Sequence, residues 1–138
     1  MPPRDLIRVF ISHAWKLGGD YGRVVQLLYE LEFLHWENYS NPKDSGGFFT
    51  TNGSRRKKIT AQMHPVHAVV IVSDMYEEDK EWVEFELNEA VRMRKPIIVV
   101  EPKLAHVPVP YILVERAMIV VPWHGYKLGS AIQSFSIK

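Results

Sequence analysis

The stretch VHAVVIVS, residues 66 to 73, constrains the fold more than any other part of the sequence. It is an almost unbroken apolar run, rich in β-branched residues and of the length of one strand. A strand without a polar face belongs in the middle of a sheet that helices cover on both sides. The run therefore predicts the central strand of a parallel sheet.

Three further apolar runs of strand length stand elsewhere in the chain, and helical patterns separate them. These runs are residues 8–12, 96–101 and 117–122, and a short strand is expected around residues 33–37. Apolar strands that alternate with helices predict an α/β domain of three layers with a mainly parallel sheet. The 138 residues fit one domain, 1–138, with a core of its own.

Four helices are expected where apolar residues recur at helical spacing. They cover residues 21–33 with Asp20 as the cap, 54–63, 79–94 before Pro96, and 125–135. Between the first two lies the long segment HWENYSNPKDSGGFFTTNGS, which we expect to be mostly loop. Loops of that length are often functional, so this segment is a candidate for ligand contact.

Composition and charge exclude several classes of function. The formal net charge is +1, so no overall field favours nucleic acid or an anionic membrane. The chain has no cysteine, which excludes a disulfide framework, a thiolate zinc site and a cysteine nucleophile. MPPRDLIRVF lacks the apolar centre of a secretory signal, and no apolar run reaches the ~20 residues of a membrane span. We expect a soluble cytoplasmic domain.

Known nucleotide loops and metal motifs are also missing from the sequence. There is no GxGxxG and no GxxxxGK[ST], and the six histidines are scattered without ligand spacing. The basic run Arg55 to Lys58 has no interleaved aromatic residues, so nucleic-acid binding is not expected. Such a run is typical of a solvated helix start, and contact with the phosphate of a nucleotide ligand is an alternative.

Polar residues follow the expected strands at the places where a ligand would bind. In open parallel sheets, ligands lie beyond the carboxyl ends of the strands. The first strand is followed by Ser12, His13 and Trp15, and the central strand by Ser73 and Tyr76. These side chains are therefore candidates for ligand contact.

The helix expected over residues 79–94 carries a carboxylate in an unusual place. Most of its acids fall on the solvent side, but Glu86 falls at the edge of the apolar stripe, one turn beyond Trp82. Either Glu86 reaches solvent or a base such as Arg23, or it is a carboxylate placed for chemistry. Phe85 is expected to point away from the core, where an exposed ring could act as an assembly contact.

Four segments of the chain resemble one family. They are VFISHAW, ENYSNP, HAVVIVSDMYEEDKEWVEFELNEAVRMRKPIIVVEP and AMIVVPWHGYKLGSAI, which together span about Arg8 to Ile132. In these segments the chain resembles the TIR-like domain of the Thoeris anti-phage sensor family, ThsB. The resemblance implies the flavodoxin-like parallel sheet of TIR domains, in agreement with the expected strands.

The resemblance also implies an enzyme that consumes NAD as its substrate, with no cofactor and no metal. In catalytic TIR domains a glutamate lies four residues after a tryptophan on the helix that follows the central strand. That spacing matches Glu86 and Trp82 here, so Glu86 is implied as the catalytic carboxylate. The implied substrate-binding residues are Ser12, His13, Asn38, Ser73, Tyr76 and Trp82.

In sensors of this type, NAD is converted to a cyclic ADP-ribose isomer that activates a separate effector. The implied function is therefore an NAD glycohydrolase or ADP-ribosyl cyclase that makes a signal in bacterial antiviral defence. The implied partners are NAD, an effector reached through the nucleotide messenger, and further copies of the chain, because assembly often completes catalytic TIR sites. The alternatives are a non-enzymatic TIR-type interaction module that acts by self-association, and a plain nucleotide-binding domain.

Overall fold

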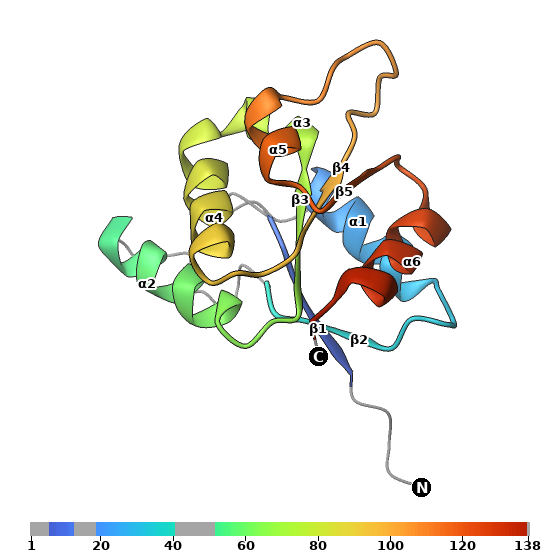
Figure 1. Ribbon diagram of the computed structural model, residues 1–138, viewed down its shortest axis with the longest axis horizontal. Helices are drawn as coiled ribbons and strands as arrows, with labels where there is room; N and C mark the ends of the chain where they lie inside the picture. The colour runs from blue at the N-terminus through green and yellow to red at the C-terminus, as the bar shows by residue number, and fades with distance from the viewer. Residues whose placement is uncertain (1–5, 13–18, 41–51, 138) are drawn as a thin grey trace, which may run out of the picture.

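The apolar run at the centre of the sequence forms strand β3 (Ala68–Val72), and all five of its residues are buried. In this computed structural model, which describes residues 6–12, 19–40 and 52–137, β3 is the middle strand of a five-stranded sheet (Figure 1). The strand order is β2-β1-β3-β4-β5, and every pairing is parallel. This is the strand order of flavodoxin-like folds.

The inner strands are apolar on both faces and the edge strands are short. The remaining strands are β1 (Ile7–Ile11), β2 (Trp36–Asn38), β4 (Ile97–Val100) and β5 (Ile119–Val121). β1 and β4 flank β3 and are almost completely buried, whereas β2 and β5 have three residues each. Short edges expose few unpaired backbone groups. The predicted α/β class, the parallel sheet and all five strands are confirmed.

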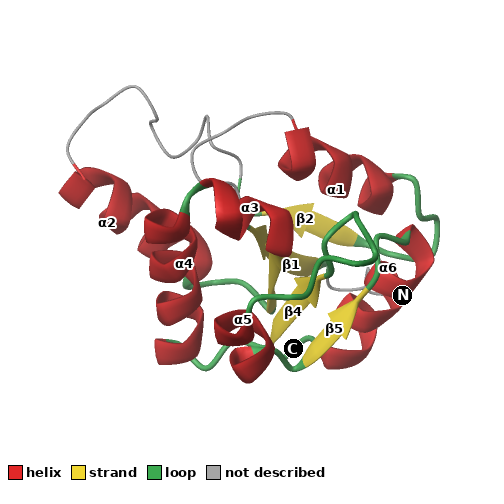
Figure 2. Ribbon diagram, turned by 90° about the horizontal axis from the view of Figure 1, so that it is seen from above, coloured by secondary structure: helices red, strands yellow, loops and turns green. Residues whose placement is uncertain are grey.

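Helices cover both faces of the sheet (Figure 2). On one face lie α1 (Gly19–Tyr29) and α6 (Gly125–Phe135), which contact each other. On the other face lie α2 (Asn52–Met63), α3 (Ser73–Glu78), α4 (Lys80–Arg92) and α5 (Tyr111–Arg116), with α2 packed alongside α4. Among the described residues, no helix is long and apolar enough to cross a membrane.

The helix predicted over residues 21–33 is wrong at both ends. In the structure, α1 begins at Gly19 and ends at Tyr29, well before Phe33. Asp20 therefore lies in the first turn and not at the cap, and its carboxylate pairs with Lys103 of a distant loop. An acid in the first turn still stabilises the helix, because it faces the positive end of the helix dipole.

Two helices were not predicted. The first, α3, has the mostly polar sequence SDMYEE, and only Ser73 and Met75 in it are buried. The second, α5, follows Pro110 in a stretch rich in proline, and it buries Leu113 against the core. Six residues are too few to show a helical period in the sequence, so tertiary packing decides both helices.

Leu113→Ala should lower the free energy of unfolding by about 2–5 kcal/mol, because it leaves a cavity under α5. Val114→Ala on the same helix removes an exposed side chain and should change it by less than about 0.5 kcal/mol. Urea unfolding of both variants measures the difference. Equal losses would contradict the packing of α5 on the sheet.

Candidate active site

Two buried serines lie at the carboxyl ends of the adjacent strands β1 and β3. Ser12 follows β1 and Ser73 begins α3 directly after β3. The Oγ of Ser12 accepts a hydrogen bond from the backbone N–H of Val72 at 3.3 Å, so Ser12 ties the two strand ends together. The Oγ of Ser73 has no hydrogen-bond partner among the described residues. A buried hydroxyl without a protein partner is costly, and Ser73 is therefore suited to a ligand.

Glu86 is fully buried, with a relative exposure of 0%. It shares the inner side of α4 with Val83, Leu87 and other apolar residues. Because α4 connects the parallel strands β3 and β4, it runs antiparallel to them and its first turns lie at the carboxyl edge of the sheet. Helical Cα–Cβ bonds tilt toward the N-terminus of their helix, so a side chain in the second turn of α4 starts out in the direction of this edge.

The burial of Glu86 bears on the interpretation in which it reaches solvent. A carboxylate at the edge of the stripe would reach solvent, and Glu86 does not. The base considered as its partner, Arg23, is exposed on α1, on the opposite face of the sheet (Figure 2). Glutamate is rarely buried to this extent, and a buried acid at the ligand-binding edge of a sheet is a candidate for function.

Trp82 lies one turn before Glu86 and is only 8% exposed. Its backbone N–H donates to the carboxylate of Asp79, which caps α4. The guanidinium of Arg55 on α2 lies 5.8 Å from the centre of the Trp82 ring, within reach of a cation–π interaction. Trp82 therefore forms a fixed wall beside the position of Glu86.

Phe85 is half-buried, and the prediction that it points away from the core is wrong. Its ring makes an edge contact with Trp82 at 6.1 Å between ring centres. The guanidinium of Arg56 lies 5.7 Å from its ring centre on the other helix. The helix α2 packs alongside α4 and covers part of Phe85, a tertiary contact that the periodicity of α4 alone does not reveal.

Tyr76 of α3 is fixed to α4 by its hydroxyl, which donates to Glu84 Oε2 at 2.8 Å. This hydrogen bond raises the pKa of Tyr76 above its ordinary value, because the carboxylate stabilises the protonated phenol. Burial and the negative charges of Glu84 and Glu77 act in the same direction. Tyr76 therefore stays protonated in neutral solution, and it orients α3 against the first turns of α4.

Asn38, at the carboxyl end of β2, is held by two neighbours that the sequence did not identify. Its Nδ2 donates to the hydroxyl of Tyr21 at 2.9 Å, which joins β2 to α1. Its Oδ1 accepts from the backbone N–H of Ser40 at 2.8 Å and from the Ser40 hydroxyl at 2.5 Å. An Asn whose side chain accepts from the N–H two residues later forms an Asx turn, and the Asn-x-Ser spacing was the available signal.

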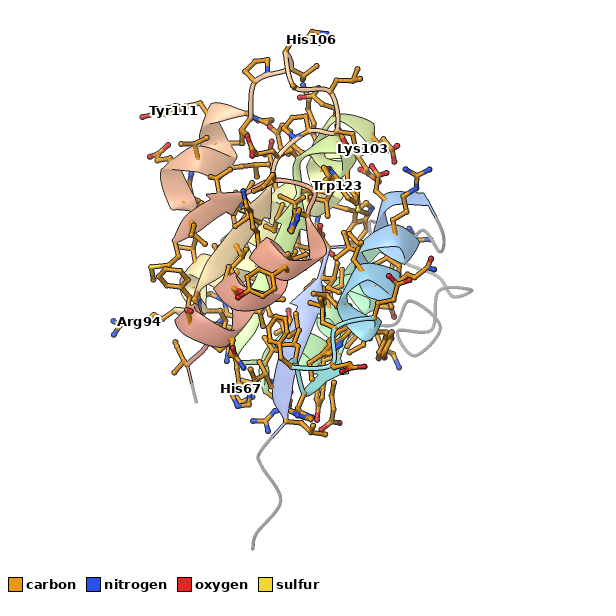
Figure 3. All side chains as sticks on the ribbon, turned by 90° about the vertical axis from the view of Figure 1, so that its right-hand side faces the viewer. His67, Arg94, Lys103, His106, Tyr111 and Trp123 are labelled. Atoms are coloured by element: carbon orange, nitrogen blue, oxygen red, sulfur yellow. The ribbon has the colours of Figure 1, made fainter. Side chains whose placement is uncertain are left out.

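Lys103, in the loop after β4, joins four segments at the same edge and was also missed. Its Nζ pairs with Asp20 of α1, and its backbone N–H donates to Asp74 of α3 at 3.0 Å. The same Nζ lies 5.6 Å from the ring centre of Trp123, which follows β5 (Figure 3). No local pattern links these positions, because their proximity depends on the order of the parallel strands.

The structure thus brings together part of the predicted site. Ser12 is hydrogen-bonded to Val72, the residue before Ser73, and Trp82 and Glu86 are one turn apart on α4. Asn38 and Tyr76 are fixed by hydrogen bonds. The predicted positions His13 and Trp15 lie outside the described residues, as do residues 41–51 of the segment expected to be mostly loop.

Comparison with known proteins gives a family and a related solved structure. The family model for the Thoeris protein ThsB, TIR-like domain, matches residues 10–106, a range that contains every predicted site residue. The structure of the Clostridium botulinum CMP N-glycosidase BcmB is similar, with a TM-score of 0.58 and 16% identity over 91% of this chain and 98% of that chain. Likeness at that identity concerns the fold. No curated protein matches the chain.

Glu84→Gln should lower the pKa of Tyr76 toward its ordinary value, because it removes the charged acceptor that holds the phenol proton. NMR titration of ring-labelled tyrosines measures this shift, with Tyr76→Phe to identify the resonance. Glu81→Gln, at an exposed acid of the same helix, is the control and should leave the titration unchanged. A Tyr76 pKa equal in wild type and Glu84→Gln would contradict the hydrogen bond.

Proposed function

The chain belongs to the family of the Thoeris protein ThsB, TIR-like domain, and we propose that it is an NAD-cleaving enzyme with Glu86 as its catalytic carboxylate. One observation carries the proposal: Glu86 is fully buried in the second turn of α4, one turn beyond Trp82, and the first turns of α4 lie at the carboxyl edge of the sheet. The related fold of BcmB, a CMP N-glycosidase, supports cleavage of an N-glycosidic bond in a nucleotide.

The proposed reaction breaks the bond between C1′ of the ribose and the nicotinamide nitrogen. The bonding electron pair goes to the positively charged ring nitrogen, so nicotinamide leaves as a neutral molecule and positive charge develops on the ribose. A buried carboxylate stabilises that charge strongly, because the surrounding dielectric constant is low and the group is already in place. Nicotinamide needs no general acid to depart, so one carboxylate suffices where most glycosidases use two.

The product depends on what reaches C1′ next. Water gives ADP-ribose and loses a proton as it bonds to C1′. A nucleophile of the same molecule gives a cyclic isomer: a hydroxyl loses its proton as it bonds, whereas a ring nitrogen bonds through its lone pair and takes over the positive charge. Cyclisation requires that water be excluded and the nucleophile be held close, which is a matter of positioning. We assign the cyclic ADP-ribose-type signal, which would activate an effector in antiviral defence, to this second route.

The other side chains have supporting roles in the proposed site. Trp82 would form an aromatic wall beside the nicotinamide or ribose, and the hydroxyl of Ser73 would bind a ribose hydroxyl. Ser12, Asn38, Tyr76 and His13 remain proposed contacts to the rest of NAD. The proposal also includes assembly of the chain with further copies of itself, which would complete the site.

Glu86→Gln should reduce nicotinamide release from NAD by about 100-fold or more, as expected when one preorganised electrostatic contact is lost. Chromatography of nicotinamide measures the rate at protein concentrations that allow assembly. Glu81→Gln makes the same chemical change at an exposed acid of α4 and should keep the wild-type rate. Thermal unfolding of both variants confirms that they fold.

Equal rates for wild type and Glu86→Gln would remove Glu86 from the catalytic role. Absence of turnover by the wild type in every assembled state would instead favour the non-enzymatic interaction module.

Ser73→Ala should raise the KM for NAD severalfold and leave the free energy of unfolding nearly unchanged, because the hydroxyl has no described protein partner to lose. Ser12→Ala is the comparison: it removes the bond to Val72 and should lower that free energy by about 1 kcal/mol. Steady-state kinetics and urea unfolding measure both effects. An unchanged KM for Ser73→Ala would exclude Ser73 from substrate binding.

A further inference from the structure

A groove of about 430 Å³ lies between α2 and α4 and shares no residue with the proposed active site. Lys57, Thr60 and Ala61 of α2 line it, and so does His64, which follows the last residue of α2. These four positions have the i, i+3, i+4, i+7 spacing of one helix face. From α4 it is lined by Phe85 and, one turn later, by Glu89. The volume lies in the range of small-molecule sites, roughly 300–1,000 Å³.

Glu89, the one acid among the described residues that line the groove, has its charge compensated within the protein. Its two oxygens accept hydrogen bonds from Arg92, each at 2.8 Å, and Oε2 also accepts from the hydroxyl of Thr60 at 2.7 Å. The bonds from Arg92 hold the pKa of Glu89 below its usual value, so it stays ionised and paired. Glu89 therefore supports the wall of the groove and does not oppose an anion there.

The rim of the groove is basic. The sequence of α2, NGSRRKKITAQM, contains four cationic side chains and no acid. Among the described residues Lys57 forms no ion pair, and the pair of Arg56 with Glu81 is long, at 3.9 Å, and more than half exposed on both sides. Two cations thus stand beside an aromatic ring in one groove. A positive field of this kind favours the binding of an anion, and binding is stronger when part of the ligand is apolar.

We infer that this groove is a second nucleotide-binding site, which takes a nucleoside diphosphate. Phe85 and Ala61 provide an apolar floor for the base, and Lys57 and Arg56 bind the phosphates from the rim. Inorganic phosphate would use the rim alone and leave the floor empty. Because Phe85 belongs to α4, a ligand bound here contacts the helix that carries Glu86.

Calorimetric titration with ADP, pyrophosphate and adenosine tests the inference. Lys57→Ala should weaken binding of ADP and of pyrophosphate by about tenfold, since it removes a charged phosphate contact. Lys58→Ala is a matched control, because it removes the same charge from the next residue, which is exposed and does not line the groove. It should weaken binding by less than about twofold, as expected of a screened surface charge.

The Phe85→Ala variant distinguishes binding of the base from binding of the phosphates. It should weaken the binding of ADP by about fivefold, because one contact between the base and the ring is lost, and leave the binding of pyrophosphate unchanged. ADP that binds no more tightly than pyrophosphate would overturn the assignment of the base, and equal effects of Lys57→Ala and Lys58→Ala would overturn the site. ADP bound at the active site instead would respond to Glu86→Gln and not to Lys57→Ala, which would also contradict the groove.

Discussion

The burial of β3 on both faces is the constraint on which the rest of the structure depends. Its five apolar residues have no side that tolerates water, so helices have to cover the sheet above and below. Parallel strands then require crossover helices that run back against them, which places the first turns of α4 at the carboxyl edge. The position of Glu86 follows from this arrangement, because it lies in the second turn of that helix.

Much of the fold was predictable from the sequence because the inner strands and the long helices carry their burial in their own pattern. The helical periodicity identified Glu86 as the acid nearest the apolar side of its helix, and its complete burial agrees with that placement. The short helices α3 and α5 were not predictable, since six residues contain less than two turns. The packing of α2 against Phe85 and the contacts of Lys103 join elements far apart in the chain, and no local pattern encodes them.

The same helix presents different chemistry on two adjacent sides. Toward the sheet, α4 buries Glu86 among apolar residues, where a carboxylate can interact strongly with positive charge on a substrate. Toward α2, it presents Phe85 and the paired Glu89 to a basic groove. The proposed reaction and the proposed second site therefore share the helix α4. The family membership bears on the proposed reaction and not on the second site.

The most direct test of the proposed activity is mass analysis of the products formed when NAD is incubated with the protein purified from phage-infected cells. The proposed site predicts free nicotinamide in equal amount with ADP-ribose or its cyclic isomer. Recovery of intact NAD from the assembled and activated protein would contradict an NAD-cleaving role for Glu86.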